Sequence, residues 1–214
     1  MRAVWDALAA AETEVYVGDP ARGEEELASL FGRLGADPRG GVCVEVGCGP
    51  GRMTGALAAR FDHVVAVDVS PGMIARAREE VTAANVEFRE VSGERLDGVA
   101  DGSADVAVCY LVLQHLPSRR LVRAYVRELA RVLRPGGEAF VQLPVLSGGI
   151  VPRLWRALRT PFARVSKPEL RGVRLTRAEF DRAIAGARLT IVATDVGPDS
   201  PYRFSTDLFL RLRR

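Results

Sequence analysis

The sequence is short of several features that would each point to a particular class of protein. Three cysteines in 214 residues form no Cys-x-x-Cys pair, which disfavours a disulfide framework or a zinc site and favours free thiols. The longest charge-free apolar run, Val106–Leu113, is too short to span a bilayer. Asp6 and Glu12 interrupt the N-terminal apolar residues, so no signal peptide is expected. These absences favour a globular protein in the cytoplasm.

Positive charge is concentrated in one segment. Residues 144–177 hold eight basic residues and one acid, whereas the rest of the chain holds 22 basic and 26 acidic residues. Arg153, Arg156 and Arg159 recur every three positions, which is typical of a basic amphipathic helix. Such a helix suits an anionic or membrane-associated acceptor, or is an ordinary solvated face. A single basic stripe without interleaved aromatic residues does not indicate nucleic-acid binding.

Apolar runs and helical segments alternate along the middle of the chain. Strands are predicted over residues 42–46, 63–68, 86–91, 105–110 and 138–143, with helices over about 53–60, 71–84 and 118–134 between them. The strands are apolar enough to be buried on both faces, so the pattern indicates a doubly wound parallel sheet.

The two ends of the chain depart from this alternation. Two helical pieces are predicted between residues 3 and 35, and Thr176 with Glu179 forms a plausible capping box for a later helix. Strands over 189–196 and 205–212 have no helix between them, so they are expected to pair antiparallel. We therefore predict an α/β fold with a seven-stranded, Rossmann-like sheet, in which five parallel strands are joined by a C-terminal antiparallel hairpin and helices cover both faces.

The length suits one domain, in which we distinguish four parts. These are an N-terminal helical cap (1–40), a cofactor-binding core (41–143), a basic substrate-side insertion (144–177), and a C-terminal helix with its hairpin (178–214).

A glycine-rich loop follows the first predicted strand. Gly47, Gly49 and Gly51 recur at every second position, where they let the backbone approach a ligand more closely than a side chain would allow. Arg52 occupies the position of the last glycine in a dinucleotide fingerprint, which argues against NAD or FAD. No Lys-Ser or Lys-Thr follows, so a P-loop is excluded.

Four blocks together resemble the class I S-adenosylmethionine-dependent methyltransferases. The likeness is to the small-molecule, ubiquinone/menaquinone-biosynthesis-like branch (methyltransferase types 11 and 12). The blocks are Val44–Gly51, Val64–Met73, Asp101–Leu116 and Glu128–Gly137. The likeness covers roughly residues 41–143, and it implies S-adenosyl-L-methionine as cofactor and S-adenosyl-L-homocysteine as product.

The resemblance implies cofactor contacts at the first two strands. Glu45 would hold the methionine part near its ammonium group, and the loop Gly47-Cys48-Gly49-Pro50-Gly51 would pass close to the ribose and the methionine part. Asp68 would accept both ribose hydroxyls, the role of the corresponding acid in dinucleotide folds. A surface acid at Glu45 and a plain helix cap at Asp68 are the alternatives. Val69 and Met73 would flank the adenine or belong to the core.

The loop after the third strand departs from the family pattern, which often reads Gly-Asp-Ala there. Ser92 and Gly93 are expected to touch the adenine, and Glu94 would replace the missing acid. Cys109 and Leu111 end the fourth strand, where backbone carbonyl contact with the cofactor amine is expected.

The acceptor side is expected to include Tyr16, Gln114 and His115, together with the segment after Leu143. His115 is the one histidine placed to act as a general base. In this family, however, the same motif also serves as helix-entry packing without a base role. No metal is expected.

Methyl transfer from a sulfonium to an O, N or C atom is an in-line displacement, which depends mainly on alignment of the reactants. The favoured function is therefore a small-molecule methyltransferase, with no nucleic-acid partner. A nucleic-acid or protein methyltransferase and a non-catalytic S-adenosylmethionine-binding protein remain as alternatives.

Overall fold

The computed structural model describes residues 2–10, 22–146, 172–199 and 205–214. Tyr16 and most of the basic segment therefore lie outside the described residues. The helices are α1 Arg2–Ala9, α3 Gly23–Arg33, α4 Thr54–Ala58, α5 Pro71–Glu80, α6 Arg119–Val132 and α8 Arg177–Gly186, with a short 3-10 helix, η2, at Leu113–His115. The strands are β1 Val42–Val46, β2 His63–Asp68, β3 Val86–Glu90, β4 Ala104–Cys109, β5 Leu133–Leu146, β6 Leu175–Thr176, β7 Thr190–Asp199 and β8 Ser205–Arg213.

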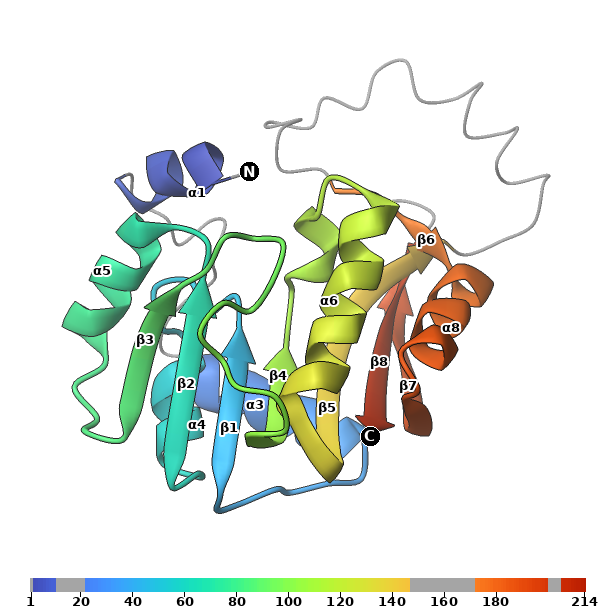
Figure 1. Cartoon of the computed structure of the whole chain (residues 1–214), viewed down its shortest axis with the longest axis horizontal. Coiled ribbons are helices and arrows are strands. Elements are labelled where there is room, and N and C mark those ends of the chain that lie inside the picture. The colour runs from blue at the N-terminus through green and yellow to red at the C-terminus, as the bar shows by residue number, and fades with distance from the viewer. Residues whose placement is uncertain (1, 11–21, 147–171, 200–204) are drawn as a thin grey trace.

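The strands form one mixed sheet in the order β3-β2-β1-β4-β5-β8-β7 (Figure 1). β1 to β5 run parallel to one another, and β8 runs antiparallel to both β5 and β7. The predicted fold class is confirmed. The short strand β6, which pairs with the end of β5, was not predicted.

The last strand of the hairpin, rather than the first, borders the parallel sheet. Leu208, Leu210 and Leu212 of β8 are buried, whereas Val192 and Val196 of β7 are 40% and 60% exposed. The more apolar strand thus takes the inner position, where both of its faces are covered.

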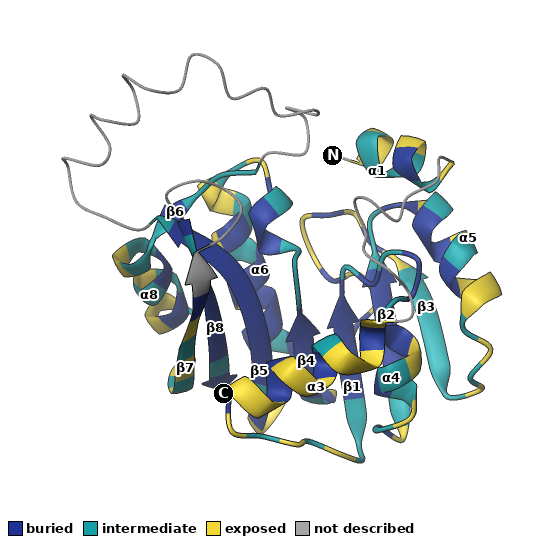
Figure 2. Ribbon diagram, turned by 180° about the vertical axis from the view of Figure 1, so that it is seen from behind, coloured by how far each residue is buried: buried dark blue, intermediate teal, exposed yellow. Residues whose placement is uncertain are grey.

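Helices cover both faces of the sheet, as predicted. Figure 2 shows α3 and α4 across one face, and Figure 1 shows α6 and α8 across the other. Phe31 of α3 and Phe140 of β5 pack edge to face, with ring centroids 4.7 Å apart. On the α6 face, Leu96 and Val99 of the loop after β3 join the same core as Val44 and Val65.

The predicted helix starts are formed by side-chain caps. The Ser70 hydroxyl accepts a hydrogen bond from the Met73 amide at 3.1 Å, and Thr176 and Glu179 form a reciprocal capping box. The prediction that the first of these helices extends to about residue 84 was wrong, because Val81 takes an extended conformation (φ −114°, ψ 106°) and α5 ends at Glu80.

No helix in the described ranges combines the length and the apolar character needed to cross a bilayer.

Candidate functional site

The carboxyl ends of β1, β2 and β4 meet at one edge of the sheet. Val46 of β1 is in register with Val67 of β2 and with Cys109 of β4. The glycine loop continues this pairing beyond β1, because the amides of Gly47 and Cys48 donate to the Val67 carbonyl at 2.8 and 3.0 Å. Parallel pairing therefore brings together the glycine loop, the end of β2 and the end of β4.

Gly47 and Gly49 of this loop differ in what surrounds them. Gly47 has a φ of +73°, and a Cβ there would lie 2.4 Å from Cγ2 of Val112. Gly49 also has a positive φ, +55°, but nothing lies within 4 Å of its missing Cβ. Gly47 is thus required by packing against the turn after β4, whereas Gly49 borders open space that a ligand could fill.

Asp68 joins the end of β2 to the glycine loop. One carboxylate oxygen accepts from the Gly49 amide at 3.0 Å, and the other accepts from the Ser70 amide at 2.9 Å. Burial raises the pKa of Asp68, against the lowering effect of these hydrogen bonds. The carboxylate is therefore held in a fixed orientation at the loop, beyond a simple helix cap.

Glu45 is a buried acid, not a surface one. It is 5% exposed, and it accepts a hydrogen bond from the Thr54 hydroxyl at 2.6 Å. Burial raises the pKa of Glu45 to about 8, and the nearby Asp68 adds to the shift. A buried carboxyl with this pKa favours a cationic ligand group, since a neighbouring positive charge would stabilise its ionised form.

Arg52, which stands where a dinucleotide fingerprint has its last glycine, makes contacts with α3 and with Tyr110. Its side chain is 9% exposed and forms an ion pair with Glu26 of α3. Its guanidinium also lies over the Tyr110 ring, 5.8 Å from the centroid. The residue at this position therefore ties α3 to the loop and to the end of β4.

The loop after β3 is held by Asp97, a contact that was not predicted from the sequence. The Ser92 amide donates to a carboxylate oxygen of Asp97 at 2.8 Å, and hydrogen bonds from Ser92 lower the pKa of Asp97. Gly93 is buried with a φ of +87°, whereas Ser92 and Glu94 are exposed. Asp97 closes a local turn. The only feature of the sequence that could have indicated this contact is that Asp97 follows Ser92 by five positions.

The same loop is held from behind by α6. Buried Glu128 accepts from the Leu96 amide at 2.9 Å. Arg131 donates to the carbonyls of Val99 and Leu96 at 2.7 and 3.1 Å. These contacts fix the loop that is expected to border the adenine.

Helix α1 lies over the carboxyl edge beside α5 (Figure 1). Arg2 donates to the Val69 carbonyl at 2.8 Å and pairs with Glu90. The Ser70 hydroxyl donates to Asp6 at 2.5 Å. These α1 contacts were not predicted individually, because nothing in the local sequence indicates the partners of a short helix.

Trp5 of α1 contacts His115, one of the residues predicted to lie on the acceptor side. Its ring meets that of His115 edge to face, with centroids 5.1 Å apart and an interplanar angle of 84°. Gln114 is 7% exposed, and its amide nitrogen lies 3.1 Å from Nε2 of His115. The donor and acceptor roles in this contact depend on the tautomer of the His115 ring.

The end of β4 combines a buried thiol and a strained turn. Cys109 is fully buried, and burial raises the pKa of its thiol to about 12, so it is a core group and not a nucleophile. Leu111 has a φ of +59°, which costs a non-glycine residue about 1–2 kcal/mol. Met73 is likewise core, at 1% exposed.

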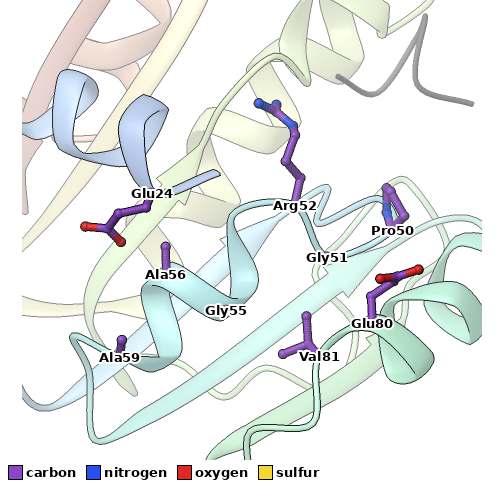
Figure 3. A pocket seen from close by; sticks show the side chains of 9 residues that line it. All are labelled: Glu24, Pro50, Gly51, Arg52, Gly55, Ala56, Ala59, Glu80 and Val81. Atoms are coloured by element: carbon purple, nitrogen blue, oxygen red, sulfur yellow. The ribbon is translucent and has the colours of Figure 1, made fainter. Parts of the chain in front are cut away.

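A pocket of about 410 Å³ lies behind the glycine loop, between α4 and the end of α5 (Figure 3). Its lining residues are Glu24, Pro50, Gly51, Arg52, Gly55, Ala56, Ala59, Glu80 and Val81. It includes neither Glu45 nor Asp68, so it is separate from the edge where the predicted cofactor residues meet. Within the described ranges, no group of three or more His, Cys, Asp or Glu residues is placed to hold a metal ion.

Gly47→Ala and Gly49→Ala should differ in stability. Both substitutions place a side chain at positive φ, but only the first creates a contact of 2.4 Å with Val112. We expect Gly47→Ala to lower the free energy of unfolding by about 1–3 kcal/mol more than Gly49→Ala. Urea denaturation of both variants measures the difference, and equal losses would contradict this packing role for Gly47.

Glu45 should make the stability of the ligand-free protein depend on pH. The folded state retains the Glu45 proton up to about pH 8, whereas the unfolded chain releases it near 4.5. Stability should therefore fall as pH rises from 5 to 8. Glu45→Gln should remove part of this fall in thermal melts, whereas Glu79→Gln, at an exposed position of α5, should retain it. Identical pH dependence in all three proteins would contradict the raised pKa.

Comparison with known proteins finds matches to the middle of the chain. Residues 44–141 match the family model described as a methyltransferase domain. A ubiquinone biosynthesis O-methyltransferase of Xanthomonas oryzae pv. oryzae is 33% identical over 107 residues, which cover 49% of this chain and 44% of that protein. The match thus spans less than half the length of this relative.

Solved structures show the same fold over nearly the whole chain. A methyltransferase of Haloferax volcanii, solved in complex with the Trm112 activator, superposes with a TM-score of 0.72 at 19% identity, covering 98% of this chain and 96% of that one. DhpI, solved in complex with SAM and HEP, gives a TM-score of 0.69 at 21% identity, covering 99% and 95%. The match over residues 44–141 agrees with the resemblance carried by the four sequence blocks, and the solved structures show that the chain has the methyltransferase fold.

Proposed function

We propose that this protein binds S-adenosylmethionine at the carboxyl edge of β1 and β2 and transfers its methyl group to a small-molecule acceptor, at an oxygen atom. The observation that supports this most directly is the Asp68 carboxylate, which is fixed against the glycine loop by the Gly49 and Ser70 amides. The choice of oxygen rests on the relatives named O-methyltransferases.

The residues at this edge fit the cofactor. The open space beyond Gly49 leaves room for a ligand against bare backbone. Asp68 presents a carboxylate for the ribose hydroxyls, and Glu45 presents a buried acid for the ammonium group of the methionine part. Ser92, Gly93 and the backbone of Val69 would border the adenine.

The bound cofactor would supply an electrophilic methyl group on a sulfonium. The protein would contribute chiefly alignment, and fixed orientation of two reactants is worth roughly 7–11 kcal/mol. Helix α1 would cover the edge through the contacts of Arg2 and Asp6, excluding water from the reacting groups. Cys48 is buried in the loop, where burial raises its thiol pKa, so it would line the site without reacting.

His115 as general base remains a prediction. Its Nε2 lies 3.1 Å from the Gln114 amide nitrogen, so a base role through Nε2 would require it to exchange this contact for one with the acceptor hydroxyl. The alternative from the sequence, a packing role, is supported by the edge-to-face contact with Trp5.

The other functions have distinct tests. No Asn-Pro-Pro-Tyr-type tetrapeptide follows β4, where Tyr110-Leu-Val-Leu stands instead, so a nucleic-acid target is not favoured. Salt-sensitive RNA binding would revive that option. Tight S-adenosylhomocysteine binding without turnover on any acceptor would favour a non-catalytic protein. No observation on the described residues favours an anionic or membrane-associated acceptor over a neutral one.

The most informative test of the function is a methyl-transfer screen with isotope-labelled S-adenosylmethionine against small phenols and metabolite extracts. We expect label in a low-molecular-weight product whose new bond is to oxygen. Label recovered only in RNA or protein would overturn the proposal.

Asp68→Ala should weaken S-adenosylhomocysteine binding by about one to two orders of magnitude, on the scale of lost charge-assisted hydrogen bonds. Asp181→Ala removes the same charge from an exposed ion pair on α8 and should bind as wild type does. Isothermal titration calorimetry measures both. Unchanged affinity in Asp68→Ala would reject the ribose role.

His115→Ala tests the base hypothesis. A general base contributes about 10²- to 10⁴-fold to the rate, so the variant should lose at least 100-fold in kcat together with the inflection of the pH–rate profile near neutrality. A lower kcat with an unchanged profile would assign His115 to packing against Trp5 instead.

A further inference from the structure

Strands β4, β5 and β8 lie side by side in the sheet (Figure 1). A chain of side-chain hydrogen bonds crosses these strands at the carboxyl end of β4 and β5. The Leu111 amide donates to Oε1 of Gln142 at 3.1 Å. Nε2 of Gln142 donates in turn to Oδ1 of Asp207 at 3.0 Å. We call Leu111, Gln142 and Asp207 the relay.

The two hydrogen bonds of the relay can run in only one direction. A backbone amide can only donate, so the Gln142 oxygen must face Leu111. The Gln142 nitrogen must then face an acceptor, and the Asp207 carboxylate provides it. Gln142 is 2% exposed, so neither end of its amide could exchange its partner for bulk water.

The relay acts on the strained residue of the turn. Leu111 has a φ of +59°, and Gln142 satisfies the amide that this conformation turns toward β5. The Leu111 carbonyl accepts from Gln114 at 3.4 Å, which connects the turn to η2 and His115. The relay therefore determines the backbone path between the end of β4 and the acceptor side.

Two further contacts hold the same turn from outside the sheet. The Gly172 amide and Nη1 of Arg174 both donate to the Gln114 carbonyl, at 3.0 and 2.9 Å. Asp207 is near enough to Arg174 for that guanidinium to lower its pKa, although burial is the larger effect and raises it. The C-terminal end of the basic segment is thus connected to the turn, through the Gln114 carbonyl.

We propose that Gln142 and Asp207 are positioning residues for methyl transfer: they fix the Leu111 turn so that the cofactor edge and the acceptor side keep one geometry. This role rests on the proposed function. It also predicts a backbone effect that exists without any ligand.

Four variants test the relay. Gln142→Leu removes it, and Asp207→Asn keeps an acceptor for the Gln142 amide while removing the charge. Gln142→Glu places two carboxylates face to face. The double variant Gln142→Glu/Asp207→Asn restores the relay with the roles exchanged, since the side-chain amide introduced at position 207 donates to the new carboxylate at position 142. The total charge of the double variant is that of the wild type.

The first measurement is amide hydrogen exchange at Leu111 by NMR in the full-length, ligand-free protein, with the Val108 amide of central strand β4 as internal reference for global stability. We expect at least tenfold faster exchange at Leu111 in Gln142→Leu and Gln142→Glu, relative to Val108. Asp207→Asn and the double variant should stay within threefold of wild type. Should Gln142→Leu fail to fold, Asp207→Ala provides the milder loss, with the same direction expected.

The second measurement is methyl transfer to the acceptor found for the wild type. We expect kcat to fall at least tenfold in Gln142→Glu and to return to within threefold of wild type in the double variant. A merely structural role would change stability without this rescue of kcat.

The proposal is contradicted if amide exchange at Leu111 is unchanged in Gln142→Leu. It is also contradicted if the double variant restores neither the slow exchange nor the kcat lost in Gln142→Glu. Failure of the proposed function is separable from these results. If the wild type neither binds S-adenosylhomocysteine nor transfers a methyl group, the role in transfer falls with the function, whereas the exchange data still decide whether the relay holds the turn.

Discussion

One carboxylate connects the two strands on which the site depends. Asp68 accepts from the Gly49 amide of the glycine loop and from the Ser70 amide at the start of α5. Because parallel pairing already places the loop amides against the Val67 carbonyl, these bonds fix the loop and the acid relative to each other. A ligand that meets this edge therefore encounters a carboxylate whose orientation is set in advance, which reduces the ordering that binding would otherwise require.

The proposed acceptor side is held by contacts between distant parts of the chain. Trp5 of α1 packs on His115, Arg174 donates to the Gln114 carbonyl, and Gln142 holds the Leu111 amide. The proposed cofactor edge is thus built from neighbouring strand ends, whereas the proposed acceptor side gathers α1, the end of the basic segment and β5.

The sequence was sufficient for features with a local physical cause. Strand periodicity, the Ser70 and Thr176 caps, the glycine loop and the acid at the end of β2 all follow from residue types within a few positions. The relay could not be predicted in this way, because Leu111 and Gln142 are 31 positions apart and Gln142 and Asp207 are 65 apart. The inner place of β8 and the contacts of α1 depend on tertiary packing for the same reason. The burial of Glu45 could not be predicted from the sequence either, since an acid at the end of a strand can face either the solvent or the core.

The central claim is that the glycine loop and Asp68 together form the S-adenosylmethionine site. A crystal structure of the protein grown with S-adenosylhomocysteine tests it most directly. The account predicts the ribose hydroxyls within hydrogen-bonding distance of Asp68 and the methionine part against the backbone of Gly47–Gly49. A ligand bound elsewhere, such as in the pocket behind the loop, with Asp68 still bonded only to Gly49 and Ser70, would contradict it.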